Sequence, residues 1–190
     1  MTLQLDLFGA DDAAAPPAGL SLSGRLVEPD EDARLADLID ATGLSPFRFQ
    51  QWTGKRMTRS FGWHYDFEGG GIAHAEPMPD WLADIRQRTV SAFGDDPAHY
   101  EQALLIRYDP GAGIGWHRDR PQFGRVIGLS LGTPATMRLR KRSGAGFERT
   151  SFELEPGHAY RLDGPARREW EHSIVPLEQP RWSITFRTLA

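Results

Sequence analysis

The sequence predicts an α+β domain in which two N-terminal helices flank a jelly-roll or cupin-like barrel. Three observations support this prediction. Strand-like segments follow one another from about residue 100 to the end, turn residues separate them, and two amphipathic segments precede them. About eight strands at this spacing are typical of a double-sheet jelly roll. The predicted strands are residues 102–108, 114–118, 125–131, 136–141, 147–154, 158–162, 169–175 and 181–188.

The N-terminal half is expected to begin with a disordered tail over residues 1–20. Residues 10–19 are rich in alanine, proline and glycine, and such a segment cannot bury enough apolar surface to fold. The tail carries a short apolar segment at residues 4–8 and leads into a single domain over residues 21–190. A first strand is predicted at residues 22–27.

Two amphipathic helices are predicted in this half. The first covers residues 31–41, with Asp30 as its N-cap and Thr42-Gly43 at its end. Pro79-Asp80 opens the second, which covers residues 80–93. The apolar residues expected to face inward are Leu35, Leu38 and Ile39 in the first helix and Trp81, Leu82, Ile85, Val90 and Phe93 in the second.

Composition excludes several classes of protein. A net charge of −4 does not fit a protein that coats nucleic acid through bulk charge, and no apolar run is long enough to cross a membrane. The N-terminus has no secretory signal pattern, so we expect a cytoplasmic protein, and we expect a monomer. Because cysteine is absent, a metal must be bound by histidine and carboxylate, which suits Fe(II), Mn(II) or Zn(II).

A candidate metal site combines a short motif with a distant histidine. His117 and Asp119 are separated by one residue at the end of a predicted strand, so both side chains point to the same face. His172 lies on a late predicted strand and supplies a third ligand. Two histidines and one carboxylate leave three positions of an octahedron open, which suits Fe(II), a bidentate 2-oxo acid and O₂.

Two arginines on the last predicted strand indicate an anionic co-substrate. Alternation puts Arg181, Ser183 and Arg187 on one face of the strand. Buried guanidiniums require anions, and arginine pairs with carboxylates in a bidentate fork. A dicarboxylate such as 2-oxoglutarate meets this need. The alternative is that both arginines lie at an exposed C-terminal edge.

The sequence resembles the AlkB family of Fe(II)/2-oxoglutarate dioxygenases over most of its length. The resemblance is carried by residues 107–112 (RYDPGA), 117–119 (HRD), 130–132 (SLG), 172–174 (HSI) and 181–187 (RWSITFR), the last similar to the family pattern R-x-N-x-T-F-R. It implies a double-stranded β-helix and oxidation of alkyl groups on nucleobases. It implies iron ligands at His117, Asp119 and His172, 2-oxoglutarate binding by Tyr108 and Arg181, and a position for Arg187 near the iron-bound end.

Three positions depart from the family pattern. Ile106 stands where the family often has asparagine, which removes a polar contact near the co-substrate. Ser183 replaces the asparagine of the C-terminal pattern, and its hydroxyl has a shorter reach. Pro121 stands where some DNA-repair members carry an acidic residue that reads the base. The iron chemistry is therefore better specified than the substrate, and the catalytic barrel is assigned to residues 100–190.

Residues 55–75 are the candidate nucleotide-recognition lid. Residues 47–52 and 59–67 are aromatic-rich and strand-like, three glycines follow at 69–71, and this mix suits stacking on bases and contacts with phosphates. The alternative role for each aromatic residue is the core. Two basic runs, at 55–59 and 138–142, are either phosphate contacts or solvated hairpin tips. The candidate substrate-binding residues are Arg59, Trp63, Tyr65, Trp116, Arg138 and Arg140.

These features predict a dioxygenase that removes alkyl groups from bases in single-stranded DNA or RNA, with Fe(II), 2-oxoglutarate and O₂. A tRNA-acting demethylase or hydroxylase of the same family, or a protein or small-molecule hydroxylase, are the alternatives. Residues Gln4-Leu5-Asp6-Leu7-Phe8 resemble the short linear motif that binds the bacterial sliding clamp. This segment either binds such a partner or packs on the domain.

Overall fold

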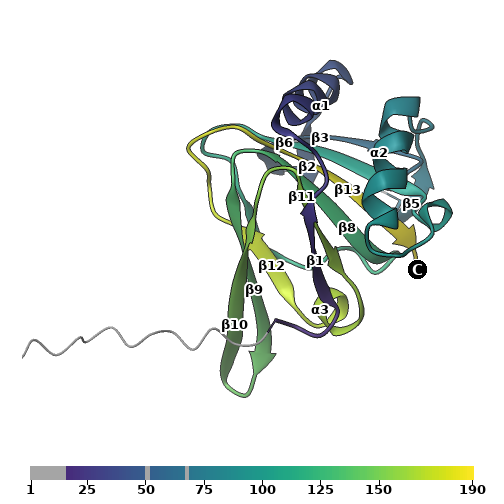
Figure 1. The fold of residues 1–190 in the computed structure, drawn as a ribbon. Coiled ribbons are helices and arrows are strands. Elements are labelled where there is room, and N and C mark those ends of the chain that lie inside the picture. The colour runs from purple at the N-terminus through teal and green to yellow at the C-terminus, as the bar shows by residue number, and fades with distance from the viewer. Residues whose placement is uncertain (1–15, 50–51, 67–68) are drawn as a thin grey trace, which may run out of the picture.

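Two antiparallel sheets face each other in the computed structural model, which describes residues 16–49, 52–66 and 69–190 (Figure 1). The larger sheet has the strand order β1-β11-β8-β13-β6-β3-β2, and the smaller has the order β10-β9-β12-β7. Strands β4 and β5 form a separate pair. The predicted jelly roll is confirmed, because β6 to β13 divide into four strands of each facing sheet.

The strands of the barrel lie close to their predicted positions. Strand β9 has the alternation of buried and half-buried residues that the pleat of a strand with one buried face imposes, whereas β6 and most of β13 are buried on both faces. The strands are β6 (Gln102–Tyr108), β7 (Ile114–His117), β8 (Phe123–Gly132), β9 (Ala135–Ser143), β10 (Gly146–Leu154), β11 (His158–Leu162), β12 (Glu171–Ile174) and β13 (Arg181–Leu189).

The N-terminal half extends the larger sheet and covers it. The extending strands β1, β2 and β3 pair with β11, with each other and with β6. The elements of this half are β1 (Leu20–Arg25), α1 (Pro29–Ala41), β2 (Ser45–Phe49), β3 (Trp52–Phe61), β4 (Trp63–Asp66), β5 (Gly71–His74), α2 (Asp80–Ser91) and the 3-10 turn η1 (Pro97–His99).

Helices α1 and α2 cover the outer face of the larger sheet, as Figure 1 shows. Leu35 and Ile39 of α1 and Leu82 of α2 are buried in one cluster with sheet residues such as Leu129 and Phe186. Burying each of these side chains contributes about 1.5–3 kcal/mol, which is why two helices of modest amphipathicity stay on the sheet. A second cluster, which includes Met137, Leu139 and Trp170, fills part of the space between the sheets.

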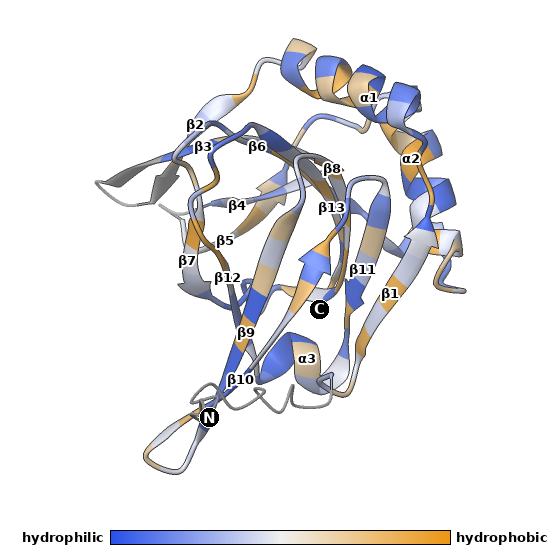
Figure 2. Ribbon diagram, turned by 60° about the vertical axis from the view of Figure 1, so that its left-hand side comes forward, coloured by the Kyte–Doolittle hydropathy of each residue, from blue (hydrophilic) through white to orange (hydrophobic). Residues whose placement is uncertain are grey.

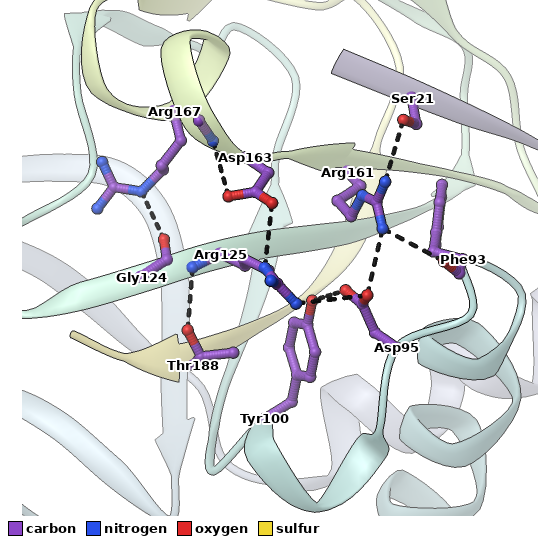
Figure 3. A network of polar contacts seen from close by, with 11 residues as sticks. Ser21, Phe93, Asp95, Tyr100, Gly124, Arg125, Arg161, Asp163, Arg167 and Thr188 are labelled. Carbon is purple, nitrogen blue, oxygen red and sulfur yellow. Dashed lines mark hydrogen bonds and ion pairs between the residues drawn. The ribbon is translucent and has the colours of Figure 1, made fainter. Parts of the chain in front are cut away.

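A polar network fixes the chain after α2 to the larger sheet (Figure 3). The Asp95 carboxylate accepts a 2.5 Å hydrogen bond from the Tyr100 hydroxyl, and Arg161 and Arg125 contact it at 3.3 and 3.4 Å. Arg125 also reaches Asp163 at 3.1 Å. The network joins the α2 end, β8 and β11, which hold one end of the barrel together.

Several predicted boundaries differ from the structure. Helix α1 begins at Pro29 with Glu28 as its cap, so Asp30 lies in the first turn and is not the N-cap. A short helix, α3 (Gly164–Arg168), occupies the connection before β12, which starts at Glu171 rather than at residue 169. The sequence analysis assigned this connection to a turn because Pro165 and Gly164 are typical turn residues.

The tail and the lid also differ from expectation. Residues 16–19 are hydrogen-bonded to the domain, because Gly19 and Ala18 carbonyls accept from Asp163 and Ala166, so the predicted disordered tail does not extend to residue 20. The clamp-like segment 4–8 lies outside the described residues. Of the candidate lid, β3 belongs to the larger sheet and only the β4–β5 pair stands apart. None of the described helices is both long and apolar enough to cross a membrane.

Candidate active site

A cavity of about 1330 Å³ opens between the two sheets. It exceeds the usual range for small-molecule sites, about 300–1000 Å³, so it has room for a co-substrate and part of a larger substrate together. Its walls contain all three predicted iron ligands and the four predicted co-substrate residues. These are His117, Asp119, His172, Tyr108, Arg181, Ser183 and Arg187.

The predicted iron ligands lie together on one wall. His172 on β12 pairs in register with His117 on β7, and their ring centroids are 4.2 Å apart. The register then shifts before the Ile174–Ile114 pair, and such a bulge adds a residue that re-aims side chains. Asp119 follows β7, with its Oδ2 3.8 Å from His172 Nε2.

Local electrostatics keep these groups in their metal-binding forms. Burial, reinforced by the neighbouring His117, lowers the pKa of His172 to about 3, and burial also lowers the pKa of His117. Burial alone would raise the pKa of Asp119, but Arg187 and the histidines outweigh it and hold that pKa below its ordinary value. Neutral imidazoles and an ionised carboxylate are the forms that bind a divalent metal.

Hydrogen bonds orient two of the ligands. His117 Nδ1 lies 2.9 Å from the Gly115 carbonyl oxygen, which favours the tautomer with a free lone pair on Nε2. Arg187 donates to Asp119 Oδ1 at 2.6 and 3.0 Å and to Gln102 Oε1 at 3.0 Å. Oδ2 of Asp119 thus stays directed to His172. Among the described residues, no three His, Asp or Glu side chains lie close enough together to hold a metal ion without moving.

Arg181 is a buried cation with no carboxylate partner among the described residues. Its side chain is 1% exposed, its Nη2 donates a hydrogen bond to Ser130 Oγ at 3.1 Å, and Tyr108 is a second polar neighbour. Its Nε and Nη1 have no hydrogen-bond acceptor in the described part of the chain. Its guanidinium carbon lies 5.2 Å from the Tyr108 ring centroid, and burial lowers its pKa. A buried guanidinium in this state requires a carboxylate from a ligand.

The face of β13 is the one that alternation predicts. Arg181, Ser183, Thr185 and Arg187 all line the cavity, whereas Ile184 and Phe186 lie in the core under the helices. The opposite strand contributes Ile106, which is also on the cavity wall and makes it apolar where the family pattern has a polar residue.

Tyr160 is a cavity residue that the sequence analysis missed. It is 8% exposed on β11, and burial and the nearby Asp119 raise the pKa of its hydroxyl. The ring fits only because β8 has a glycine: a Cβ on Gly128 would lie 2.4 Å from the ring. Gly128 pairs with Tyr160 across the two strands. A glycine opposite an aromatic residue could have identified Tyr160, but only once the pairing of the strands was known.

Arg167 on α3 was also missed. It is 8% exposed and donates to three carbonyl oxygens of the turn that follows Asp119: Arg120 at 2.8 Å, Phe123 at 2.6 Å and Gly124 at 2.9 Å. Figure 3 shows its contact with Gly124. It therefore fixes the backbone that carries one predicted ligand.

The mouth of the cavity is basic and aromatic. Tyr65, one of the candidate substrate residues, lines it with the Arg120 guanidinium 4.6 Å from its ring centroid. Arg56 of β3 lines it beside Phe47, at 4.5 Å from that ring centroid. Trp116 lines it at the edge of the smaller sheet. The described mouth thus offers flat rings and cations to a substrate.

Two candidate substrate residues lie elsewhere. Arg59 is on the opposite face of β3 from Arg56 and forms a 2.6 Å ion pair with Glu76. Trp63 stacks on His74, at 3.9 Å between ring centroids, and lines a shallow hollow next to α2. Both placements correct the expectation, because strand alternation sends Arg56, Thr58 and Ser60 into the cavity instead.

The candidates Arg138 and Arg140 lie on the outer face of the smaller sheet. In β9, the alternate residues Met137 and Leu139 are buried between the sheets. Arg138 and Arg140 point away from the cavity that holds the predicted iron ligands, and both contact the Trp116 ring.

Comparisons with known proteins show which family the chain resembles. The model of the 2OG-Fe(II) oxygenase superfamily matches residues 46–187. The chain is 26% identical to alpha-ketoglutarate-dependent dioxygenase AlkB of Escherichia coli, over 96% of this chain and 97% of that protein. It is 32% identical to alkB homolog 7 of Bos taurus over 51% of this chain and 44% of that protein.

A further relative is much longer than this chain. The tRNA (carboxymethyluridine(34)-5-O)-methyltransferase ALKBH8 of Macaca fascicularis is 24% identical over 85% of this chain, and the match spans only 25% of that protein. Only a quarter of that protein is therefore comparable with this chain.

Two solved structures share the fold. OsALKBH1 superposes with a TM-score of 0.70 at 16% identity, covering 91% of this chain and 97% of that one. A Pseudomonas putida prolyl-4-hydroxylase superposes with a TM-score of 0.60 at 20% identity, covering 90% and 93%. With the family match, these findings identify the chain as an AlkB-family member of the 2OG-Fe(II) oxygenase superfamily, a dioxygenase that uses Fe(II), 2-oxoglutarate and O₂.

Proposed function

We propose that this dioxygenase removes alkyl groups from N-alkylated bases in single-stranded nucleic acid. One observation carries the proposal: a single cavity contains a His-Asp-His set, a buried unpaired guanidinium and a basic, aromatic mouth. The three features match iron, 2-oxoglutarate and a polynucleotide.

We assign the iron to His117, Asp119 and His172. Their donor set, two neutral imidazoles and one carboxylate, is the one that non-haem Fe(II) oxygenases use. His172 Nε2 and Asp119 Oδ2 lie 3.8 Å apart, so one ion could be held by both.

We assign the distal carboxylate of 2-oxoglutarate to Arg181. A carboxylate would accept from the free Nε and Nη1 atoms in the bidentate geometry that guanidiniums favour. Ser183 and Tyr108 are its neighbours: Ser183 is two residues along the same face of β13, and Tyr108 pairs with Arg181 in register. Arg187 is occupied by Asp119, so its role is to hold that ligand.

We assign the substrate base to the mouth of the cavity. Tyr65 supplies a ring for stacking, and Arg56 supplies a cation in the same cavity. A base must leave its stack to enter such a cavity, which single strands permit at low cost. Fe(II) held by the three ligands would supply an oxidation in which 2-oxoglutarate and O₂ become succinate and CO₂ and one oxygen atom enters a C–H bond of the N-methyl group. The carbon would then leave as formaldehyde, and the hydroxyl proton would pass to the ring nitrogen.

The test is mass spectrometry of N-methylated single-stranded DNA, RNA and tRNA after incubation with the protein, Fe(II), ascorbate and 2-oxoglutarate, with succinate measured in parallel. We expect loss of a methyl group that depends on both Fe(II) and 2-oxoglutarate. The Asp119→Asn variant, which keeps an acceptor for Arg187, should form no succinate. Succinate without any change in the nucleic acids would contradict the substrate assignment.

A tRNA substrate is the second candidate. Pro121 lines the cavity where a carboxylate would read a DNA base, and one relative has tRNA in its name. The tRNA arm of the same experiment decides between the two, because demethylation confined to tRNA would favour this candidate.

A further inference from the structure

The outer face of the smaller sheet carries a ladder of arginines and aromatic rings. We call it the arginine face and define it by six residues on β7, β9 and β10. Figure 2 shows hydrophilic stretches along the projecting β9–β10 hairpin. In these strands, directly opposed residues share a face: Arg142 pairs with Phe147, and Arg140 pairs with Arg149. The six residues are Trp116, Arg138, Arg140, Arg142, Phe147 and Arg149.

Aromatic rings hold the arginines in place. The Arg140 guanidinium carbon lies 4.4 Å from the Trp116 ring centroid and 4.5 Å from the Phe147 ring centroid. Arg138 lies 5.0 Å from Trp116, and Arg142 and Arg149 lie 5.0 and 5.4 Å from Phe147. A cation held by a ring has lost conformational freedom but keeps its N–H donors for an anion.

The positive charge on this face is not balanced by the described chain. Glu171 pairs with Arg140 at 2.6 Å, but no described carboxylate forms an ion pair with Arg138, Arg142 or Arg149. Arg140 and Arg149 are directly opposed, and like charges in this position destabilise a sheet. The local field of this face is therefore positive although the net charge of the protein is −4, and such a field attracts an anionic partner.

The arginine face is continuous with the mouth of the cavity. β7 is the edge strand of the smaller sheet, and its Trp116 both lines the cavity and contacts the arginines. A polymeric substrate with one of its units in the cavity would therefore cross β7 at Trp116. From there, β9 and β10 present arginines in the direction away from the cavity.

We propose that the arginine face binds the phosphate backbone of a single-stranded polynucleotide next to the base held in the cavity. The occupant follows from charge complementarity and from the route over Trp116. Guanidiniums contact phosphate oxygens without reading sequence, so this face adds affinity and positions the strand. The inference rests on the proposed function, because it takes the cavity substrate to be part of a polynucleotide.

The test compares Arg142→Gln/Arg149→Gln with wild type in fluorescence anisotropy, using the protein with Mn(II) and 2-oxoglutarate and a labelled 20-nucleotide single strand. Each phosphate contact contributes about 0.7 to the slope of log affinity against log salt. The double variant should therefore lose about 1.4 from that slope, and its affinity at 0.1 M salt should fall at least about tenfold. Both arginines are exposed, so the variant should keep its melting temperature.

The control is Arg34→Glu, which changes the net charge by the same amount on an exposed residue of α1. It should leave slope and affinity unchanged. Equal losses in the control, or none in the double variant, would overturn the proposal. Competition by polyglutamate as strong as by the polynucleotide would also overturn it, by indicating an acidic protein.

Binding and turnover separate this inference from the proposed function. If no methylated base is demethylated but the slope still falls by the predicted amount, the arginine face stands and the dealkylase proposal fails. In the opposite case, the wild type and the double variant demethylate a methylated trinucleotide equally, and they bind the 20-nucleotide strand with the same affinity. The dealkylase proposal then stands and the proposal for the arginine face fails.

Discussion

Two buried arginines on the same strand have opposite electrostatic situations. Arg187 is 9% exposed and donates two hydrogen bonds to Asp119, so its charge is paired within the chain. Arg181 is more deeply buried and has no anion among the described residues. Breaking a buried pair is costly, whereas removing an uncompensated buried charge is not. The two residues should therefore respond differently to the same substitution.

Arg181→Met should raise the KM for 2-oxoglutarate and leave the metal-free protein as stable as the wild type or more stable. The lost charged hydrogen bonds are worth about 1.5–3 kcal/mol, which corresponds to about a tenfold to hundredfold change. Succinate formation at varied 2-oxoglutarate and thermal melting measure the two effects. Arg187→Met is the matched control and should lower stability by about 3–5 kcal/mol, because it leaves Asp119 unpaired. A large melting-temperature loss in Arg181→Met would show that a partner within the chain had been missed.

The metal-free protein should lose stability as the pH falls below about 6.5. His172 is held neutral, with its pKa lowered to about 3 from an ordinary 6.5, so the unfolded state binds the proton first. Its contribution is complete above about pH 6.5 and is lost toward about pH 3. Asp119 acts in the same direction, but only below its ordinary value of 3.8.

Urea unfolding at pH 7.0 and 5.0 measures this dependence. One proton bound only by the unfolded state lowers the free energy of unfolding by about 1.4 kcal/mol per pH unit. Between pH 7.0 and 5.0, His172 should therefore lower it by about 2 kcal/mol. The His172→Gln variant should show a shallower dependence between these pH values. An unchanged slope in that variant would indicate that other groups cause the effect.

At the scale of elements, helix α3 holds the segment of the chain that follows Asp119. The helix has only five residues, and Asp163 caps it through the Gly164 amide. Its Arg167 donates hydrogen bonds to three carbonyl oxygens of the segment that follows Asp119. A turn held in this way keeps Asp119 in position before the metal arrives, which reduces the cost of ordering on binding.

Arg167→Met should weaken Fe(II) binding as well as stability. Loss of these three hydrogen bonds should lower the free energy of unfolding by about 3 kcal/mol, since each hydrogen bond to a charged group contributes about 1.5–3 kcal/mol and neighbouring contributions are not additive. Isothermal titration with Mn(II), a redox-inactive substitute, should show weaker binding. Arg168→Met is the control, because Arg168 is exposed and contributes only its backbone carbonyl, to Arg118. Equal metal affinity in both variants would contradict this role.

At the scale of the whole molecule, the two sheets contribute different groups to the site. The smaller sheet supplies the histidines, and the larger sheet supplies Arg181 and Arg187. A ligand that contacts both sheets therefore bridges the two halves of the barrel. Such a ligand binds the folded state alone and must stabilise it.

Mn(II) and 2-oxoglutarate together should raise the melting temperature. At about 100 times its Kd, 2-oxoglutarate adds about 2.7 kcal/mol, which is about 5–10 °C for a domain of this size. Differential scanning calorimetry measures the shift. In Arg181→Met, the part of the shift caused by 2-oxoglutarate at the same concentration should be much smaller. A full shift in that variant would exclude Arg181 as the main anchor of the co-substrate.

The sequence by itself determined the features that depend on local periodicity. The positions of the barrel strands follow from strand-forming runs between turn residues, and the alternation of side chains within one strand groups Arg181, Ser183 and Arg187 on one face of β13. The spacing of His117 and Asp119 placed two candidate ligands together for a similar reason. The spacing of predicted strands and turns also indicated the fold class, and the resemblance of five short motifs indicated the AlkB family.

Only the tertiary structure decided the features that depend on register between distant strands. The pairing of Arg187 with Asp119 and the hydrogen bonds of Arg167 join residues far apart in the sequence. The described part of the chain also brings no carboxylate to Arg181. Arg59 faces away from the cavity because β3 pairs with β6 in a register that sends Arg56 inward. Periodicity fixes two faces of a strand, but only packing decides which face meets the cavity.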